Sequence, residues 1–178
     1  MIDVLLLTIA KLLAGWLIAD LIGGIMHWLE DCVLPEDLPV LGPYFIEPNR
    51  LHHSDPVAFL RGGFFGRNST TWIVAGAVSL IWAAIFGPSL VWAGATAGGM
   101  VMTMVHALAH RAPPAESWIR ALQDVGIIQS VRQHAQHHRP PSDRRYCILT
   151  DWLNPVLDWL NVWARLEGLL RLSTGRAG

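Results

Sequence analysis

Eight histidines carry most of the chemistry that this sequence offers. A neutral imidazole gives a nitrogen lone pair to iron, copper or zinc and is the commonest metal ligand in proteins. A spacing of four places two imidazoles on one side of a helix, and a His-x-x-His-His pattern places three there. The sequence therefore predicts a metal site. The candidate ligands are His27, His52, His53, His106, His110, His134, His137 and His138.

The number of histidines indicates more than one ion. A tetrahedral zinc ion takes about four ligands, and a haem takes only one or two axial histidines. A nitrogen-rich site without thiolate suits iron with open positions for oxygen. Cys32 and Cys147 are the only cysteines, too few for a thiolate zinc site or an iron–sulfur cluster, and we expect them to be free thiols in a reducing compartment. We therefore expect two iron ions, with O2 as co-substrate.

Two carboxylates follow histidines closely in the sequence. Asp31 comes four residues after His27, and Asp55 comes two residues after His53. Carboxylates commonly orient a ligand imidazole by accepting its other ring N–H. The alternative is that both are solvated loop acids or helix caps. Taken alone, His27 is also typical of an interfacial or capping residue, so the metal prediction depends on the whole set.

Redox chemistry at such a site needs electrons from outside the chain. The sequence contains no G-x-G-x-x-G pattern and no P-loop, so it offers no flavin or nicotinamide site. We therefore expect an electron-transfer protein as a partner. With 13 basic and 14 acidic residues and a net charge of -1, the chain has no overall field that attracts nucleic acid.

The composition indicates a membrane protein. Of 178 residues, 52% are hydrophobic and only 15% are charged, whereas soluble domains have about 25% charged residues. Apolar runs cover 4–27, 72–86 and 89–110, with a break at Gly87-Pro88, and a membrane crossing needs about 20 residues. The run over 72–86 is short, so a re-entrant hairpin stays open as an alternative. A signal peptide is disfavoured for the first run, because it lacks a basic leader and ends in HWLED.

Further patterns concern helix packing. Small residues on the third run, which favour close packing of helices in a bilayer, are Gly94, Ala95, Ala97, Gly98 and Gly99. Near the C-terminus, Pro155 is suited to the first turn of a helix. The apolar stripe of this expected helix consists of Val156, Trp159, Leu160, Trp163, Leu166 and Leu170. Such a stripe is typical of a helix in the membrane interface or of a core helix in the polar part of the protein.

The basic residues predict the orientation in the membrane. Lys11 precedes twelve arginines, which lie between Arg50 and Arg176, on the face shared by the loop after the first run and the segment after the third. Since cytoplasmic flanks are enriched in Lys and Arg, this face is expected to be cytoplasmic. We predict an all-α integral membrane protein, a single domain over 1–178, with about three inserted helices and a cytoplasmic His-rich metal-binding cap in a bacterial inner membrane or its equivalent.

Several arginines lie near the histidine segments at the expected interface, namely Arg50, Arg61, Arg144 and Arg145. A guanidinium group there can pair with a lipid phosphate. The alternative is that they are ordinary positive flanks of the inserted helices.

Several motifs together resemble the Kua-type lipid desaturase family, which includes plasmanylethanolamine desaturases and plastid phosphatidylglycerol desaturases. They are HWLED at 27–31, PxxGPYFIEPNRLHHSDP at 39–56, Arg61 with Phe64, His106 with His110, LQDVGIIQ at 122–129 and HAQHHRPPSDRRYCILTDWLN at 134–154. The resemblance covers nearly the whole chain. It implies a membrane desaturase that holds two irons by histidine, receives electrons from a cytochrome b5 or ferredoxin type of donor, and uses O2 to put a double bond into a phospholipid chain.

The resemblance also bears on individual residues. Asp124 and Asn154 match family positions and are expected to orient histidines or line the site. Animal members have His-Asp where this chain has Gly62-Gly63, and His where it has Gln133 and Ser142. The eight histidines present are therefore the expected ligand core. The most favoured product is the vinyl ether of plasmalogens, and the alternative is an acyl-lipid desaturase.

Other functional classes remain as alternatives. A hydroxylase uses the same type of di-iron site but places oxygen on the carbon. A non-catalytic metal or haem protein of the membrane is a further possibility. A metal transporter is disfavoured, since it predicts ionisable ligands near the middle of the spans, whereas these histidines lie at helix ends and in loops.

Overall fold

The structure, a computed structural model, describes residues 1–56, 58–61, 63–111, 113–115 and 117–174, and these residues form helices and loops without a strand. Gly62 and Arg176, which entered the sequence predictions, lie outside the described residues. The predicted all-helical class is confirmed.

Among the described residues, three helices are long and apolar enough to cross a membrane, as predicted. The first is α1 (Ile2–Trp28), which continues into the π-helical turn η1 (Leu29–Val33). The others are α4 (Phe64–Phe86) and α5 (Leu90–Ala109). Helix α4 has 23 residues and begins earlier than the predicted start at 72; at 1.5 Å per residue it is about 35 Å long, enough for a hydrocarbon core of about 30 Å.

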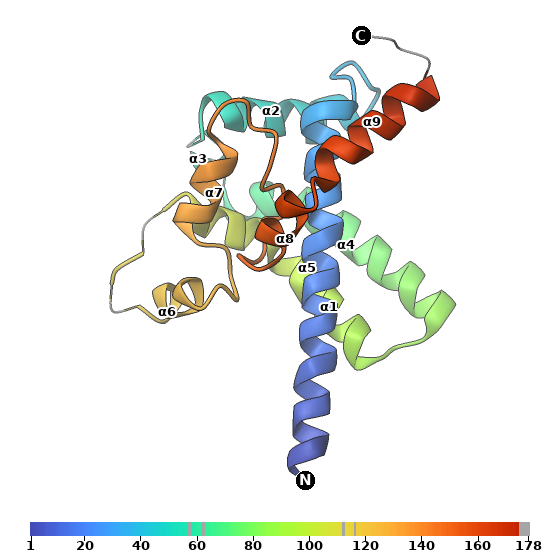
Figure 1. Ribbon diagram of the computed structural model, residues 1–178, viewed down its shortest axis with the longest axis vertical. Coiled ribbons are helices and arrows are strands. Elements are labelled where there is room, and N and C mark those ends of the chain that lie inside the picture. Colours follow the sequence, from blue (N-terminus) through green and yellow to red (C-terminus); the bar gives the residue numbers. More distant parts are fainter. Residues whose placement is uncertain (57, 62, 112, 116, 175–178) are drawn as a thin grey trace.

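Glycines bring α1 and α5 into close contact. A Cβ atom on Gly94 would overlap the carbonyl oxygen of Leu12, and one on Gly15 would overlap that of Val91. Backbones this close leave room only for glycine, the arrangement expected of small residues in membrane helices. Helix α4 packs against α5 after a turn at Gly87, whose φ of 76° suits glycine. Figure 1 shows α1 as the long vertical helix beside α5.

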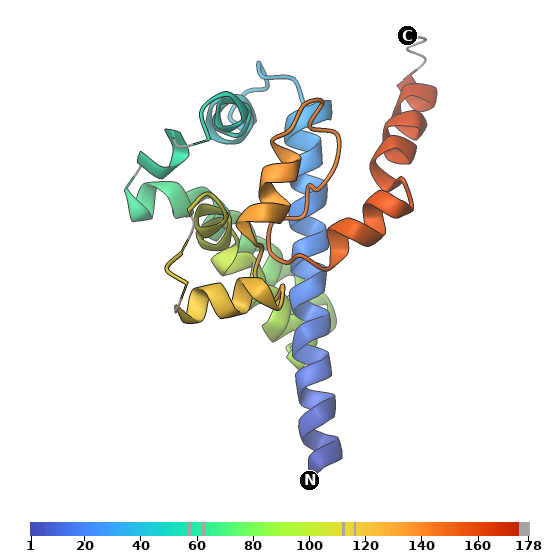
Figure 2. The same cartoon turned by 60° about the vertical axis from the view of Figure 1, so that its left-hand side comes forward.

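The short helices lie beside the half of α1 that is farther from the N-terminus, with α6 about level with its middle (Figures 1 and 2). They are η2 (Gly42–Ile46), α2 (Glu47–Ser54), α3 (Ala58–Arg61), α6 (Trp118–Asp124), α7 (Val131–His137), α8 (Leu153–Trp159) and α9 (Val162–Thr174). Together they form the cap. In both views α7 lies beside the C-terminal part of α1.

A buried carboxylate ties the cap to the first span. Asp20, fully buried on α1, accepts hydrogen bonds from the backbone N–H groups of Leu149 and Thr150 at 2.8 and 3.1 Å and from the Thr150 hydroxyl at 2.6 Å. The carboxylate thus satisfies backbone donors that would otherwise be buried without partners.

The C-terminal segment differs from its prediction. One helix was expected after Pro155, but α8 and α9 are separate helices with a break at Asn161, whose φ is 50°. Because the break turns the chain, the predicted stripe does not share one face. Trp163 is 2% exposed and packs against Trp28 and Tyr146, whereas Trp159 is 79% exposed.

Candidate metal centre

The structure brings all eight histidines together in two adjacent groups. Group one consists of His52, His106, His110, His134 and His138, and group two consists of His27, Asp31, His53 and His137. Within each group the potential ligand atoms lie within 4.8 Å of one another. The predicted gathering of the histidines is therefore present, and it is divided in two.

The histidines lie on α1, α2, α5 and α7 or at the ends of these helices, and η1 supplies Asp31. The last turn of α5 carries His106 and its C-terminal cap is His110, while α7 carries His134 and ends at the cap His138. On α2, the neighbours His52 and His53 enter different groups. Successive residues of a helix point about 100° apart because a turn takes 3.6 residues. Helix α2 lies between the two groups and therefore supplies one histidine to each.

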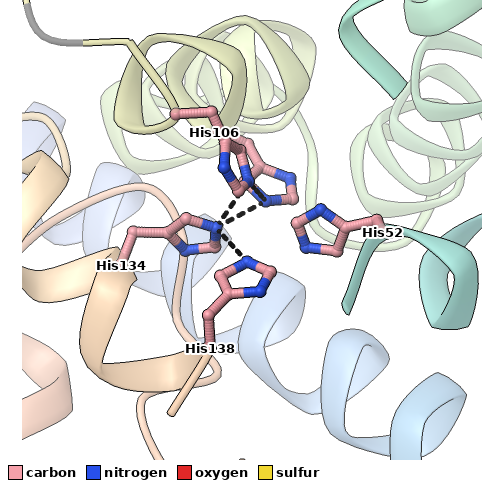
Figure 3. Close-up of side chains that lie close together, drawn as sticks. His52, His106, His134 and His138 are labelled. Carbon is pink, nitrogen blue, oxygen red and sulfur yellow. Dashed lines mark hydrogen bonds between the residues drawn. The ribbon is translucent and has the colours of Figure 1, made fainter. Parts of the chain in front are cut away.

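The imidazoles of group one converge on one point (Figure 3). Nε2 of His134 lies 3.0 Å from Nε2 of His106, 2.8 Å from that of His110 and 3.0 Å from that of His138. A neutral ring has only one N–H, so hydrogen bonds cannot account for all three contacts. Two nitrogens bound to one metal at about 2.1 Å lie about 3.0 Å apart when the angle at the metal is about 90°, and about 3.4 Å apart when it is tetrahedral. The donor atoms therefore have the spacing of metal ligands.

Burial keeps the imidazoles of group one neutral. Desolvation, followed by repulsion from neighbouring imidazoles, lowers the pKa of His110 to about 4 and that of His138 to about 3. The same causes lower the pKa values of His52 and His134 below their usual range. Since a metal ion binds only the unprotonated ring, the group is ready for a cation at neutral pH.

In group two, three imidazoles surround one carboxylate oxygen. Oδ2 of Asp31 lies 3.0 Å from Nε2 of His53, 3.3 Å from that of His137 and 3.5 Å from that of His27. Asn49 donates a hydrogen bond to the other oxygen, Oδ1, and so holds the carboxylate in place. Asp31 belongs to η1, and π-helical turns occur frequently at functional sites.

Backbone carbonyls fix the tautomers of two rings in group two. Nδ1 of His27 donates to the carbonyl of Tyr146 at 3.1 Å, and Nδ1 of His137 donates to that of Arg144 at 2.7 Å. A neutral ring held in this way presents the lone pair of Nε2 to Asp31. Both Nε2 atoms are buried without a hydrogen-bond partner. A lone pair facing a carboxylate is repulsive unless a cation lies between them, so the group fits a metal ion.

Three residues with predicted catalytic roles, Asp55, Asp124 and Asn154, lie outside both groups. Asp55 pairs with Arg61 at 2.8 Å, and Asp124 pairs with Arg120 at 2.8 Å. Asn154 is fully buried and hydrogen-bonds both the backbone N–H and the carbonyl of Cys147. The structure brings only Asp31 of the four nominated residues to the histidines, and the catalytic roles of all four stay predictions.

The arginines expected to contact phosphate have partners inside the chain. Arg50 donates to Glu36 and to the carbonyl of Leu34, both at 2.8 Å. The other three pair with acidic side chains: Arg61 with Asp55, Arg144 with Asp143 and Arg145 with Asp158. Contact with lipid phosphate stays a prediction.

Gln133 and Ser142, the positions at which the resemblance implies histidine in animal members, form hydrogen bonds within the cap. Gln133 accepts a hydrogen bond from Arg145, and the carbonyl of Ser142 accepts one from the Tyr146 hydroxyl at 3.1 Å. Neither residue is among the metal-ligating groups of the described chain.

Sequence reasoning missed Asp20, Asn49 and Tyr146 as supports of the site. A carboxylate inside an apolar span was a usable signal for Asp20, because such residues are costly unless they have a role. The role of Asn49 depends on the approach of α2 to η1, and that of Tyr146 on the fold of the cap, so nothing local marks them.

A largely apolar groove leads to the two groups. Its cavity measures about 280 Å³ and lies between α1, α4 and α5. His27 of group two and His52 and His106 of group one line one end, and Trp82 and Trp92 line the other. Between them the walls are mostly small or apolar residues, among them Ala75, Val78, Ala95 and Gly99. A slender apolar ligand fits such a groove, with its length between helices and one part beside the histidines.

Comparison with known proteins identifies the class to which this site and fold belong. The lipid desaturase domain model matches residues 16–178, and the chain belongs to this family. It is 33% identical to plasmanylethanolamine desaturase 1 of Mus musculus, over 95% of this chain and 67% of that protein. It is 30% identical to plasmanylethanolamine desaturase of Myxococcus xanthus, over 95% of this chain and 62% of that protein.

A third relative is the chloroplastic fatty acid desaturase 4 of Arabidopsis thaliana, which is 32% identical over 91% of this chain and 51% of that protein. The chain thus spans between about half and two thirds of the length of these three relatives. No solved structure matches it. All three relatives are named desaturases, which are oxidoreductases, so the predicted family and enzyme class are confirmed.

Proposed function

We propose that this protein is a di-iron, O2-dependent lipid desaturase that introduces a double bond into a phospholipid chain, with the vinyl ether of plasmalogens as its product. The observation that carries this proposal is the groove, because it places a long apolar cavity in direct line with both histidine groups. A hydrocarbon chain in the groove would have one segment beside His27, His52 and His106.

The donor sets support iron at both groups. They contain imidazole nitrogens and a single carboxylate, Asp31, and no thiolate, a combination that suits non-haem iron with open positions. When bound, the two ions would supply the oxidising power that removes two hydrogens from neighbouring carbons, while O2 is reduced to two molecules of water with two electrons from an external donor of the cytochrome b5 or ferredoxin type and two protons from solvent.

The protein's own residues position the reactants. Tyr146 and Arg144 hold the rings of His27 and His137 through their carbonyls, and Asn49 holds Asp31. The apolar walls of α1, α4 and α5 exclude water from the chain and restrict its motion, so that one C–C bond stays beside the histidines. No side chain acts as a nucleophile in this proposal.

The ether substrate is supported by the two plasmanylethanolamine desaturases among the relatives. The plastid relative is named a fatty acid desaturase, and an acyl chain is therefore the second candidate. The arginine distribution supports an integral membrane protein whose histidine groups face the cytoplasm.

Product analysis tests the proposal. The protein is expressed in a host that lacks plasmalogens and is supplied with alkylglycerol, alongside a variant with His134→Ala. Vinyl ethers, detected as aldehydes released by mild acid, should appear with the intact protein and not with the variant. A new double bond in an acyl chain would replace the ether substrate by the acyl one, a hydroxylated chain would indicate a hydroxylase, and no product with iron, O2 and a competent reductase would contradict the desaturase.

A further inference from the structure

The groove ends at two indole rings that the protein holds firmly. Nε1 of Trp92 donates to the carbonyl of Ser79 on α4 at 3.0 Å, and its backbone N–H donates to the Ser89 hydroxyl at 3.1 Å. The ring of Trp82 lies against that of Phe86, with centroids 6.1 Å apart. Since the Trp92 indole on α5 donates to a carbonyl of α4, it cannot swing away without breaking a hydrogen bond that joins the two helices.

The helices set the length of the groove. His106 and Trp92 lie on the same helix, α5, and both line the cavity. They are separated by 14 positions, and at 1.5 Å per residue this corresponds to about 21 Å along the helix axis. The groove is thus long enough for much of a lipid chain.

Four hydroxyl groups along the groove form two hydrogen-bonded pairs. The hydroxyls of Thr71 and Thr103 lie 2.5 Å apart, and those of Ser79 and Thr96 lie 2.7 Å apart. Each pair joins α4 to α5. Because one hydroxyl of each pair donates to the other, a methylene chain can lie against these two pairs without breaking a hydrogen bond.

The two ends of the groove differ in polarity. Glu30, Tyr44 and Asn49 line the part near the histidines, whereas Val78, Trp82 and Trp92 line the far part. Burying a polar head group without partners is costly. A lipid therefore enters with its head group near the histidines and its methyl end toward the two tryptophans.

We propose that Trp92, together with Trp82, is the stop of a length gauge: the indoles limit how far a chain extends beyond the carbons that lie at the histidine groups. This specificity role rests on the proposed function, since it assumes a lipid chain as the occupant. A chain that exceeds the groove must fold back or push a bonded indole aside, and such overpacking is unfavourable.

The test measures which chains the protein retains, independently of catalysis. Purified protein is reconstituted in bilayers that contain an equimolar series of saturated 1-O-alkyl and diacyl phospholipids of graded chain length, and bound lipids are identified by native mass spectrometry. The variants are Trp92→Ala, which removes the indole at the far end of the groove, and Val78→Trp, which fills the groove between that end and the histidines. The matched control is Trp72→Ala, because Trp72 also bonds a backbone carbonyl across the hairpin, that of Met100 at 2.9 Å, but does not line the groove.

The wild type and Trp72→Ala should show the same longest retained chain, with occupancy falling roughly five- to 150-fold beyond it, the range expected from overpacking. Trp92→Ala should move this limit to longer chains, and Val78→Trp should move it to shorter ones. An unchanged limit in both groove variants, with melting temperatures showing them folded, would overturn the gauge. A limit that shifts as expected in protein that forms no desaturated product would uphold the gauge and contradict the proposed function.

Discussion

His137 donates its Nδ1 hydrogen to the backbone carbonyl of Arg144 across 2.7 Å. The carbonyl has no hydrogen to give, so the neutral ring must carry its proton on Nδ1, and Nε2 faces Asp31 as a lone pair. A ring that is completely buried is held in one tautomer by the loop that follows α7. The fold of this loop therefore determines which ring atom binds metal.

Replacing His137 should empty one metal site and spare the other. We expect His137→Ala to reduce the iron content from about two ions per chain to about one, because group two loses one of its three imidazoles while group one stays complete. Metal analysis of purified protein measures this. Gln136→Ala, on the same helix, is the control and should keep both ions. Two ions in His137→Ala would contradict the division into two groups.

The stability of the metal-free protein should fall as the pH is lowered. The pKa of His110 falls from 6.5 in the unfolded chain to about 4 in the fold, and that of His138 to about 3. Below pH 6.5 the unfolded chain therefore binds more protons than the folded one, so protonation favours unfolding. Melting temperatures in detergent should decrease from pH 6.5 to about pH 4. A His138→Leu variant should show a shallower decrease, and an unchanged slope in that variant would argue against a neutral buried His138.

The hydrogen bonds from Leu149 and Thr150 to Asp20 should contribute to the free energy of unfolding. Asp20→Ala leaves the backbone N–H groups of Leu149 and Thr150 buried without an acceptor, which should cost about 2–6 kcal/mol at about 1–3 kcal/mol for each group. Thermal unfolding measures the loss. Asp3→Ala is the control, because Asp3 is an exposed residue at the other end of the same helix. Equal melting temperatures for the two variants would show that the tie contributes nothing.

The close approach of α1 and α5 can be tested with a single methyl group. Gly94→Ala places a Cβ on the carbonyl oxygen of Leu12, so we expect a loss of about 1–3 kcal/mol or more. Gly76→Ala meets no atom within 4 Å and should be neutral or stabilising by about 0.5–1 kcal/mol. Thermal unfolding distinguishes the two. A Gly94→Ala protein as stable as Gly76→Ala would contradict the packing.

Three spans would place the turn between α4 and α5 on the side opposite the cap, and the arginine distribution predicts that the side of the cap is cytoplasmic. A cysteine introduced at Pro88, in the turn between α4 and α5, should react with a reagent on the side opposite the cytoplasm, and one introduced at Glu36 should react from the cytoplasm. The background is Cys32→Ser, since Cys147 is buried and Cys32 is exposed. Labelling of both positions from one side would contradict the topology.

The sequence predicted the histidine set because metal chemistry restricts the residue types and their helical spacing. It did not predict the division into two groups. That division depends on α2 reaching the boundary with His52 on one side and His53 on the other, which is a result of tertiary packing. For the same reason Asp31 was expected to orient a ring, whereas the structure surrounds it with three.

The fold shows a similar limit. Hydropathy predicted three inserted helices, because a span must be long and apolar wherever it packs. It placed the start of α4 too late, since the more polar residues from Phe64 to Thr71 are also helical. The break at Asn161 was missed because the helical spacing of apolar residues continues across it, while the packing of Trp163 against Tyr146 requires a turn.

The bond from Asp20 to Thr150 joins positions 130 residues apart, and that from His27 to Tyr146 joins positions 119 apart. These contacts close late during synthesis, because Tyr146 and Thr150 follow all three spans along the chain. The membrane hairpin can therefore form while the histidines still lie on separate, unlinked segments. Binding of the proposed iron ions would then be the last event of assembly, because a chain whose cap has not closed on α1 has the histidines but not the site that they form together.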